Sequence, residues 1–298
     1  MRVFSSLNRV AAVGWLGLAL SACAPKVVVK NGGPLPAAAV SPASYAPLLV
    51  VKENEPFTDP AAQELGDIHI RDSGFTLICD YDMAVDLASQ RARQLGANVL
   101  RIYEHRLPSA LGSNCHRIRA KALRVPDLTP YEKEIIWHPQ RRLRQADFKG
   151  TPDNRPFEAA TSSGFRYRSG SPTGCFPLGK TVLRVETYFD CQNSYFKGTR
   201  NAAYTLQHEQ VHFDLSEVFA RRFTKLLQEQ VTNTQELQLR HDDLYRQLST
   251  EWQQLQDKYD SEVYRNPQKL PQWQQYVERE LQILQPYADK QVVLKIKV

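Results

Sequence analysis

The stretch "TLQHEQVHFDLSE" contains two histidines whose spacing suits metal binding. His208 and His212 are four residues apart, and Glu209 directly follows the first of them. Residues i and i+4 lie on one face of an α-helix, so both imidazole rings can bind a single ion. A zinc ion lowers the pKa of its bound water to about 7, and a flanking carboxylate can take a proton from that water. The pattern predicts a Zn²⁺ site in which Glu209 is the general base.

The same pattern also fits an ordinary amphipathic helix with two solvated histidines. Val211 and Leu215 begin an apolar stripe beside the histidines, as expected of such a helix. Asp214 departs from the strictest zincin signature, which prefers an apolar residue at that point. The metal-site hypothesis therefore depends on finding a further ligand.

A catalytic zinc ion usually has three protein ligands. Glu217 lies nine residues past His208 and is expected on the opposite side of the helix. The third ligand should therefore come from a downstream helix, as in gluzincins. The apolar stripe of that helix continues through Glu262 and His241, whereas Asp260 falls to one side, so the stripe favours the first two.

The elements that would position these residues are strands followed by helices. "SGFRYRSG" and "KTVLRVETYFDCQNSYF" read as strands, and a helical region extends from about Asn201 to Glu262. Asn266-Pro267 interrupts the helical pattern, "PQWQQYVERELQILQPYA" resumes it, and "KQVVLKIKV" reads as a final strand. This order predicts an α+β fold for residues 126–298.

Several segments of residues 126–298 resemble a bacterial family of unknown function that is predicted to consist of secreted zinc-dependent proteases. They follow one another between Arg141 and Val277 and cover most of this part of the chain: "RRLRQADFKGTPD", "AATSSGF", "YFDCQNSYF", "LQHEQVHFDLSEVFARR" and "YDSEV…PQWQQYV". The resemblance implies a zincin-like domain with His208 and His212 as metal ligands and Glu209 as the catalytic residue.

The family's second motif has the form "YD.ET.H" and maps onto the stretch that begins at Tyr259. The resemblance favours Asp260 as the third ligand, an aspzincin-like arrangement, and keeps Glu262 as the alternative. Val263 and Arg265 replace the usual Thr and His of the motif. These departures bear on activity rather than on fold.

Residues 48–125 have a β-α-β pattern. "LGDIHIRD", "GFTLICD", "NVLRIYEHR" and "CHRIRAKALRV" read as strands, and "DMAVDLASQRARQLGAN" reads as a helix that ends at Gly96. This segment resembles the small α/β domain of outer-membrane stress-sensor lipoproteins such as the Rcs sensor. The resemblance implies no activity.

The N-terminus predicts export and lipid anchoring. Residues 1–22 combine a basic start with a short apolar run, as a signal peptide does, and Leu20-Ser21-Ala22-Cys23 resembles a lipobox. The lipobox implies lipidation of Cys23, and Ala24 after it implies delivery to the outer membrane, facing the periplasm. Residues 23–47 are rich in Pro, Ala, Gly and Ser and predict a flexible tether.

The remaining four cysteines are expected to be oxidised in an exported protein. Their separation along the chain predicts one disulfide between Cys79 and Cys115 and another between Cys175 and Cys191. Four buried free thiols are the alternative.

The net charge of +6 excludes little by itself. The only dense basic run, "HPQRRLRQ", is expected in a solvated loop, and no nucleic-acid-binding motif accompanies it. The leading hypothesis is a lipid-anchored zinc peptidase of the bacterial cell envelope that acts on a peptide or protein substrate. The alternative is an envelope sensor or interaction lipoprotein that binds metal without turnover.

Two further roles are predicted for the peptidase hypothesis. Tyr259, Tyr264 or His241 is expected to stabilise the tetrahedral oxyanion. The strand "TVLRVETYF" is expected to be the edge strand on which an extended peptide lies.

Overall fold

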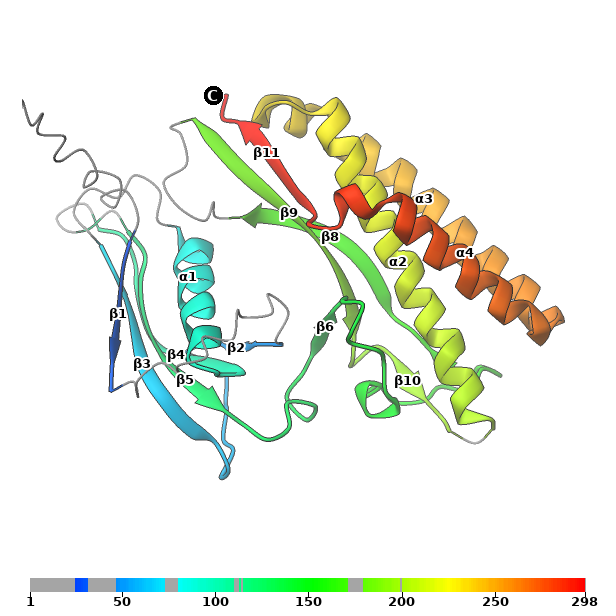
Figure 1. Cartoon of the computed structure of the whole chain (residues 1–298), viewed down its shortest axis with the longest axis horizontal. Helices are drawn as coiled ribbons and strands as arrows, with labels where there is room; N and C mark the ends of the chain where they lie inside the picture. The colour runs from blue at the N-terminus through cyan, green and yellow to red at the C-terminus, as the bar shows by residue number, and fades with distance from the viewer. Residues whose placement is uncertain are drawn as a thin grey trace, which may run out of the picture.

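The chain has an α+β fold in which most of the strands precede a group of C-terminal helices (Figure 1). The computed structural model describes residues 25–31, 47–72, 80–109, 113, 115–170, 179–198 and 200–297. The structure has two layers, one from each half of the chain, and a separate sheet forms the centre of each layer. None of the helices in these ranges is both long enough and apolar enough to cross a bilayer.

The first sheet has five strands in the order β1-β3-β5-β4-β2. Their bounds are β1 Lys26–Lys30, β2 Leu49–Val51, β3 Gln63–Arg71, β4 Val99–Arg106 and β5 Arg117–Arg124. One face of this sheet packs on α1 (Tyr81–Gln94) through Ile68, Ile70 and Ile118, which meet the alanines of the helix. Asp80 caps α1 by accepting from the Met83 amide, and the positive φ of Gly96 ends it as predicted.

The predicted tether of residues 23–47 is wrong in part, because Lys26–Lys30 forms β1. The "KVVVK" run pairs antiparallel with β3 along its whole length, from Lys26 opposite Arg71 to Lys30 opposite Asp67. Three consecutive β-branched valines favour a strand over a flexible segment. The Pro- and Ala-rich composition of the following residues had hidden this short strand.

The second sheet contains β6 (Glu134–Ile136), β8 (Ser163–Gly170), β9 (Lys180–Asp190) and β11 (Gln291–Lys295). β9 pairs with β8 on one side and with β6 and β11 on the other. The predicted edge strand "TVLRVETYF" is therefore a central strand. A separate ribbon joins β7 (Ala159–Ala160) to β10 (Tyr195–Phe196).

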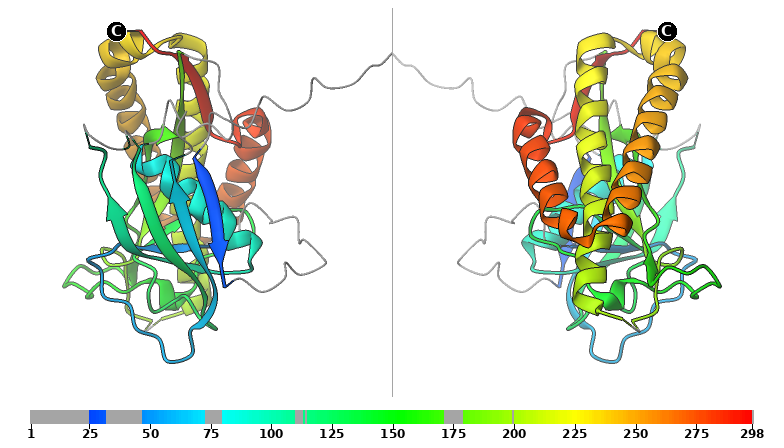
Figure 2. Two further views of the ribbon diagram at one scale, coloured as in Figure 1. Left: turned by 90° about the vertical axis from the view of Figure 1, so that its left-hand side faces the viewer. Right: turned by 90° about the vertical axis from the view of Figure 1, so that its right-hand side faces the viewer.

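Three α-helices follow the second sheet: α2 (Ala202–Gln230), α3 (Thr234–Arg265) and α4 (Leu270–Ile283). Short 3-10 turns occur at Gln145–Asp147, Pro267–Lys269 and Gln285–Tyr287. α2 is buried along most of its length because the sheet covers one side and α3 and α4 flank it (Figure 2). The predicted helical region from Asn201 to Glu262 is thus two helices, with a break at residues 231–233.

The two layers meet through α1, which lies between the sheets (Figure 1). Its outward face carries Asp86, whose carboxylate is 3.3 Å from the Arg184 guanidinium of β9. Burial raises the pKa of Asp86, although the arginine opposes that shift. The contact is a partly buried ion pair between residues far apart in sequence.

The cysteines differ in part from their predicted pairing. Cys115 is disulfide-bonded, and its expected partner Cys79 lies outside the described residues. Cys191 is a buried free thiol, so the predicted bond from Cys191 to Cys175 is wrong. Its side chain lies at the end of β9 in an apolar cluster with Phe148 and Phe189, and burial raises the pKa of the thiol to about 12. Cys23 and Cys175 also lie outside the described residues.

Gly150 allows two segments of the second layer to approach closely. A Cβ atom there would lie 2.7 Å from the Gln192 carbonyl oxygen and 2.8 Å from that of Ser194. Replacing Gly150 with alanine is expected to lower the free energy of unfolding by about 3 kcal/mol, because both obstacles are backbone atoms. Urea denaturation measures this loss.

Gly179 is the matched control for that substitution. Its φ is +87°, but nothing lies within 4 Å of an added Cβ atom. Gly179→Ala is therefore expected to cost only about 1 kcal/mol, from the left-handed backbone alone. Equal losses at the two positions would contradict a steric role for Gly150.

Candidate metal centre

α2 presents two imidazole rings on one face, as the spacing predicted. Asn201 caps this helix by accepting from the Tyr204 amide. His208 and His212 follow one turn apart, with ring centroids 4.9 Å from each other and Nε2 atoms 3.2 Å apart. His208 is buried and His212 nearly so.

α3 supplies the third group because it runs back along α2. The chain reverses at residues 231–233, and Asn233 caps α3 by accepting from the Glu236 amide. The reversal brings Asp260 beside both histidines, with its Oδ1 atom 3.1 Å from His208 Nε2 and 3.0 Å from His212 Nε2. These three residues form a group that could hold a metal ion.

The dimensions of this triangle suit a small tetrahedral ion. Its edges are 3.0, 3.1 and 3.2 Å. Zinc binds imidazole nitrogen and carboxylate oxygen at about 2.0–2.2 Å, and a tetrahedral set at that distance has ligands about 3.3 Å apart. The observed separations are therefore close to those of a zinc-ligand set.

Hydrogen bonds on the far side of each ring orient the lone pairs. Gln256 Oε1 is 2.6 Å from His212 Nδ1 and can only accept, so that nitrogen carries the proton. The Tyr259 hydroxyl donates to the His208 carbonyl oxygen (3.1 Å) and lies 2.9 Å from His208 Nδ1, which assigns a proton to that nitrogen also. Both Nε2 atoms then offer lone pairs toward Asp260.

Asp260 completes a set of three electron-pair donors. Its Oδ1 atom is buried, and its nearest polar neighbours are the two Nε2 atoms, at 3.0 and 3.1 Å. A buried carboxylate is costly unless protons on the imidazoles or a bound cation neutralise it. Two imidazole lone pairs and one carboxylate oxygen thus converge on a point that suits a cation, and the residues fit the predicted Zn²⁺.

Gln256 is the residue of this site that the sequence did not single out. It is buried and bonds to His212 through both ends of its amide. The spacing offered a signal, since Gln256 lies one turn before Asp260 and so shares its face. Such a partner fixes the tautomer and orientation of a metal-binding histidine.

Replacing Gln256 with alanine is expected to weaken zinc affinity by about 10–100-fold. The His212 ring would lose the acceptor that holds its proton on Nδ1. Competition with a chromogenic chelator measures the change. Gln253→Ala is the control, because that side chain is exposed and donates to Asp257 at 2.8 Å. Equal affinities for the two variants would contradict the orienting role.

Glu262 and His241 do not join the group. The Glu262 carboxylate accepts from Lys269 Nζ at 3.1 Å and from Trp273 Nε1 at 3.2 Å, which turns it toward α4. His241 lies near the start of α3 and pairs with Asp242 at 2.8 Å. Of the two carboxylates considered, the structure therefore brings Asp260 to the histidines and not the alternative, Glu262.

Glu209 and Tyr264 lie beside the metal group. Glu209 is almost fully buried on α2. Burial, followed by the charges of Asp260 and Glu209, raises the pKa of the Tyr264 hydroxyl well above its usual range, so it stays protonated at neutral pH. The Tyr264 ring is 5.5 Å from the His208 ring and remains half exposed. A carboxylate and a hydroxyl donor therefore flank the ligands.

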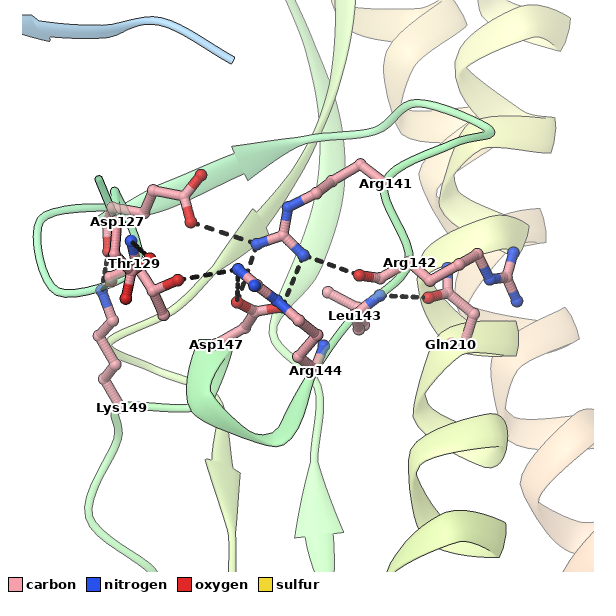
Figure 3. A network of polar contacts seen from close by, with 10 residues as sticks. Asp127, Thr129, Arg141, Arg142, Leu143, Arg144, Asp147, Lys149 and Gln210 are labelled. Atoms are coloured by element: carbon pink, nitrogen blue, oxygen red, sulfur yellow. Dashed lines mark hydrogen bonds and ion pairs between the residues drawn. The ribbon is translucent and has the colours of Figure 1, made fainter. Parts of the chain in front are cut away.

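A loop from the second layer supports the opposite side of α2 (Figure 3). The Leu143 amide donates to Gln210 Oε1 at 2.7 Å, and Gln210 Nε2 donates to Asp214 Oδ1 at 2.8 Å. Asp214 also accepts from Trp137 Nε1 at 2.7 Å. Asp214, where the sequence departs from the zincin signature, is thus a buried side chain. Its hydrogen bonds hold the turn of α2 that carries the histidines, on the side of the helix away from them.

The basic run "HPQRRLRQ" belongs to this support and is not simply a solvated loop. Arg141 is largely buried and donates to both carboxylate oxygens of Asp147, at 2.8 and 2.9 Å. It also donates to Glu132 at 3.2 Å. These bonds shape the loop that holds Leu143 against α2 (Figure 3).

Comparisons with protein-family models, with curated proteins and with solved structures found no match to this chain.

Proposed function

We propose that this protein is a zinc-dependent peptidase of the bacterial cell envelope. The observation that carries the proposal is the convergence of His208 Nε2, His212 Nε2 and Asp260 Oδ1, with the remaining histidine nitrogens held as donors. Three protein ligands from two helices are typical of catalytic zinc, whereas structural zinc usually has four.

The residues around the ligands supply the other functions that peptide hydrolysis needs. A zinc ion at this site would act as a Lewis acid toward a peptide carbonyl and lower the pKa of water. Glu209 accepts the proton of the attacking water and passes it to the leaving amine. Tyr264 donates a hydrogen bond to the developing oxyanion.

Tyr264 is the strongest of the three residues considered for oxyanion binding. The Tyr259 hydroxyl is fully buried and already bonded to His208. His241 precedes Asp260 by 19 positions on α3, which is about 28 Å along a helix. Tyr264 lies one turn past Asp260 and is half exposed, so a substrate can reach it.

An extended peptide is the substrate class that the neighbouring sheet supports. Among the described residues, β8 pairs on one side only, with β9. Its first residue, Ser163, bonds through its hydroxyl to Ser216, one turn past His212. A free strand edge that begins one helical turn from the ligands is suited to pairing with a peptide backbone. The sequence predicted β9 as the strand on which the peptide lies, and we assign this role to β8 instead.

The cell-envelope part of the proposal rests on the N-terminal sequence. The signal-peptide pattern and the lipobox at Cys23 support lipid anchoring, and Ala24 supports the outer membrane. These residues lie outside the described part of the chain.

The test compares metal content with hydrolysis. The chain is loaded with zinc and incubated with a broad library of unstructured peptides, with and without a chelator. Cleavage that the chelator abolishes and zinc restores supports the peptidase. Tight zinc binding without cleavage of any peptide would instead favour the metal-binding sensor, to which the replacement of His by Arg265 in the second motif points.

A further inference from the structure

The outer face of the first sheet carries an unusual row of positive charge. α1 covers one face of this sheet, and among the described residues no helix covers the other face (Figure 2, left). Lys26 of β1 pairs with Arg71 of β3, and Arg117 of β5 pairs with Arg106 of β4. Ile70 opposite Ile118 sets the register between β3 and β5, so Arg71 is also opposite Arg117.

The four cations Lys26, Arg71, Arg117 and Arg106 therefore stand side by side across four strands. Directly opposed residues of neighbouring strands share a face, and neighbouring strands are about 4.8 Å apart. Like charges in directly opposed positions destabilise a sheet. This row of four cations is therefore expected to lower the stability of the sheet.

Most charges elsewhere on this face have a partner. Lys121 binds Glu64 at 2.7 Å, and Arg119 binds Glu104 at 2.9 Å. The row is less balanced, since Glu104 also receives the Arg106 guanidinium. Within the described residues, the Nε atom of Arg117 is buried and has no hydrogen-bond partner.

A cavity of about 380 Å³ lies at this end of the face. Four arginines line it (Arg71, Arg106, Arg117 and Arg119) against two carboxylates (Asp72 and Glu104). Below them the His69 ring is buried and its Nδ1 atom is 3.3 Å from the Arg71 guanidinium, which helps to hold that side chain. Guanidinium groups bind phosphate oxygens through paired, charge-assisted hydrogen bonds.

We propose that this arginine-lined cavity binds a phosphate group. The ligand chemistry is a phosphate ester or diphosphate, either on a lipid headgroup or on a soluble molecule. Such an anion satisfies the buried Nε atom of Arg117 and relieves the repulsion along the row. The site is on the opposite face of the sheet from α1 and does not depend on the proposed peptidase activity.

The test uses the full chain carrying Cys23→Ser, so that no acyl chain is attached. Inorganic pyrophosphate is the probe, and isothermal titration calorimetry at low salt gives its dissociation constant. Arg117→Gln is expected to weaken binding by at least about tenfold. Lys121→Gln is the control on the same face of β5, and it is expected to leave the affinity within about twofold, since Lys121 is already paired.

A stability measurement separates binding from folding. The midpoint of thermal unfolding of Arg117→Gln is expected to equal or exceed that of the parent, because one of the like charges is removed. Loss of binding together with a lower midpoint would show that Arg117 serves the fold and would overturn the proposal. Absence of pyrophosphate binding at millimolar concentration, or equal affinity in parent and Arg117→Gln, would overturn it too.

Vesicles distinguish the two sources of phosphate. The same chain is sedimented with vesicles of phosphatidylglycerol or of phosphatidylcholine alone. Retention on the anionic vesicles that Arg117→Gln abolishes identifies a lipid headgroup as the ligand. Pyrophosphate binding without retention on either vesicle identifies a soluble phosphate compound.

Discussion

Replacing Asp260 with alanine is expected to reduce the zinc content from about one ion per chain to less than about a tenth. The substitution removes one of three ligands and leaves the two Nε2 atoms of His208 and His212 without an anionic neighbour. Metal analysis after dialysis against zinc-free buffer measures the loss. Circular dichroism shows whether α2 and α3 remain folded.

Glu262→Ala is the matched control, two residues away on the same helix. Its carboxylate binds Lys269 and Trp273, so the variant is expected to keep its zinc. Zinc lost from Glu262→Ala but retained by Asp260→Ala would reverse the assignment of the third ligand. Zinc retained by both would show that the histidines recruit another group.

Replacing Glu209 with glutamine is expected to lower kcat for peptide cleavage by about 10²–10⁴-fold while the zinc content stays unchanged. The amide keeps the size of the side chain but cannot accept the proton of the attacking water. Steady-state kinetics on a peptide cleaved by the parent, with metal analysis on the same preparation, measures both quantities.

Glu229→Gln controls for the loss of a carboxylate from the same helix. Glu229 is exposed near the end of α2 and is 3.9 Å from Lys225, so its loss is expected to leave kcat unchanged. Full activity in Glu209→Gln would remove Glu209 from the mechanism and direct attention to another base. Loss of zinc in that variant would instead assign Glu209 a structural part.

The part of the site that lies within one helix was predictable. The spacing of His208 and His212 fixes their common face by local geometry, and that face does not depend on distant parts of the chain. α1 and the strands β3, β4 and β5 of the first layer were predictable for the same reason, because alternation and helical periodicity are local patterns. The predicted strand "GFTLICD" lies outside the described residues.

The apolar stripe of α3 could not identify the third ligand. The position of Asp260 relative to the two histidines depends on the break between α2 and α3. In one continuous helix, the 52 residues from His208 to Asp260 would span about 78 Å. The break at residues 231–233 reverses the chain and sets the rotation of α3. The sequence did contain a signal, since Asn233 followed three residues later by Glu236 fits a helix-capping pattern.

Predictions from composition and from the number of cysteines were wrong at positions where local packing determines the structure. The free Cys191 thiol packs with phenylalanines, so an even count of cysteines did not guarantee pairing. The residues after Lys30 are rich in proline and alanine, and that composition was extended over a strand that pairs fully with β3.

The position of β1 has a consequence for the height of the protein above a bilayer. Only Ala24 and Pro25 separate Cys23 from the strand, so a lipid on Cys23 would hold Lys26 within about 11 Å of the anchor. The long Pro- and Ala-rich segment then connects β1 to β2 and adds no reach. If Cys23 is acylated, the folded layers would lie directly on the membrane. The distance from the bilayer to His208, His212 and Asp260 would then be set by the dimensions of these layers and not by a flexible linker.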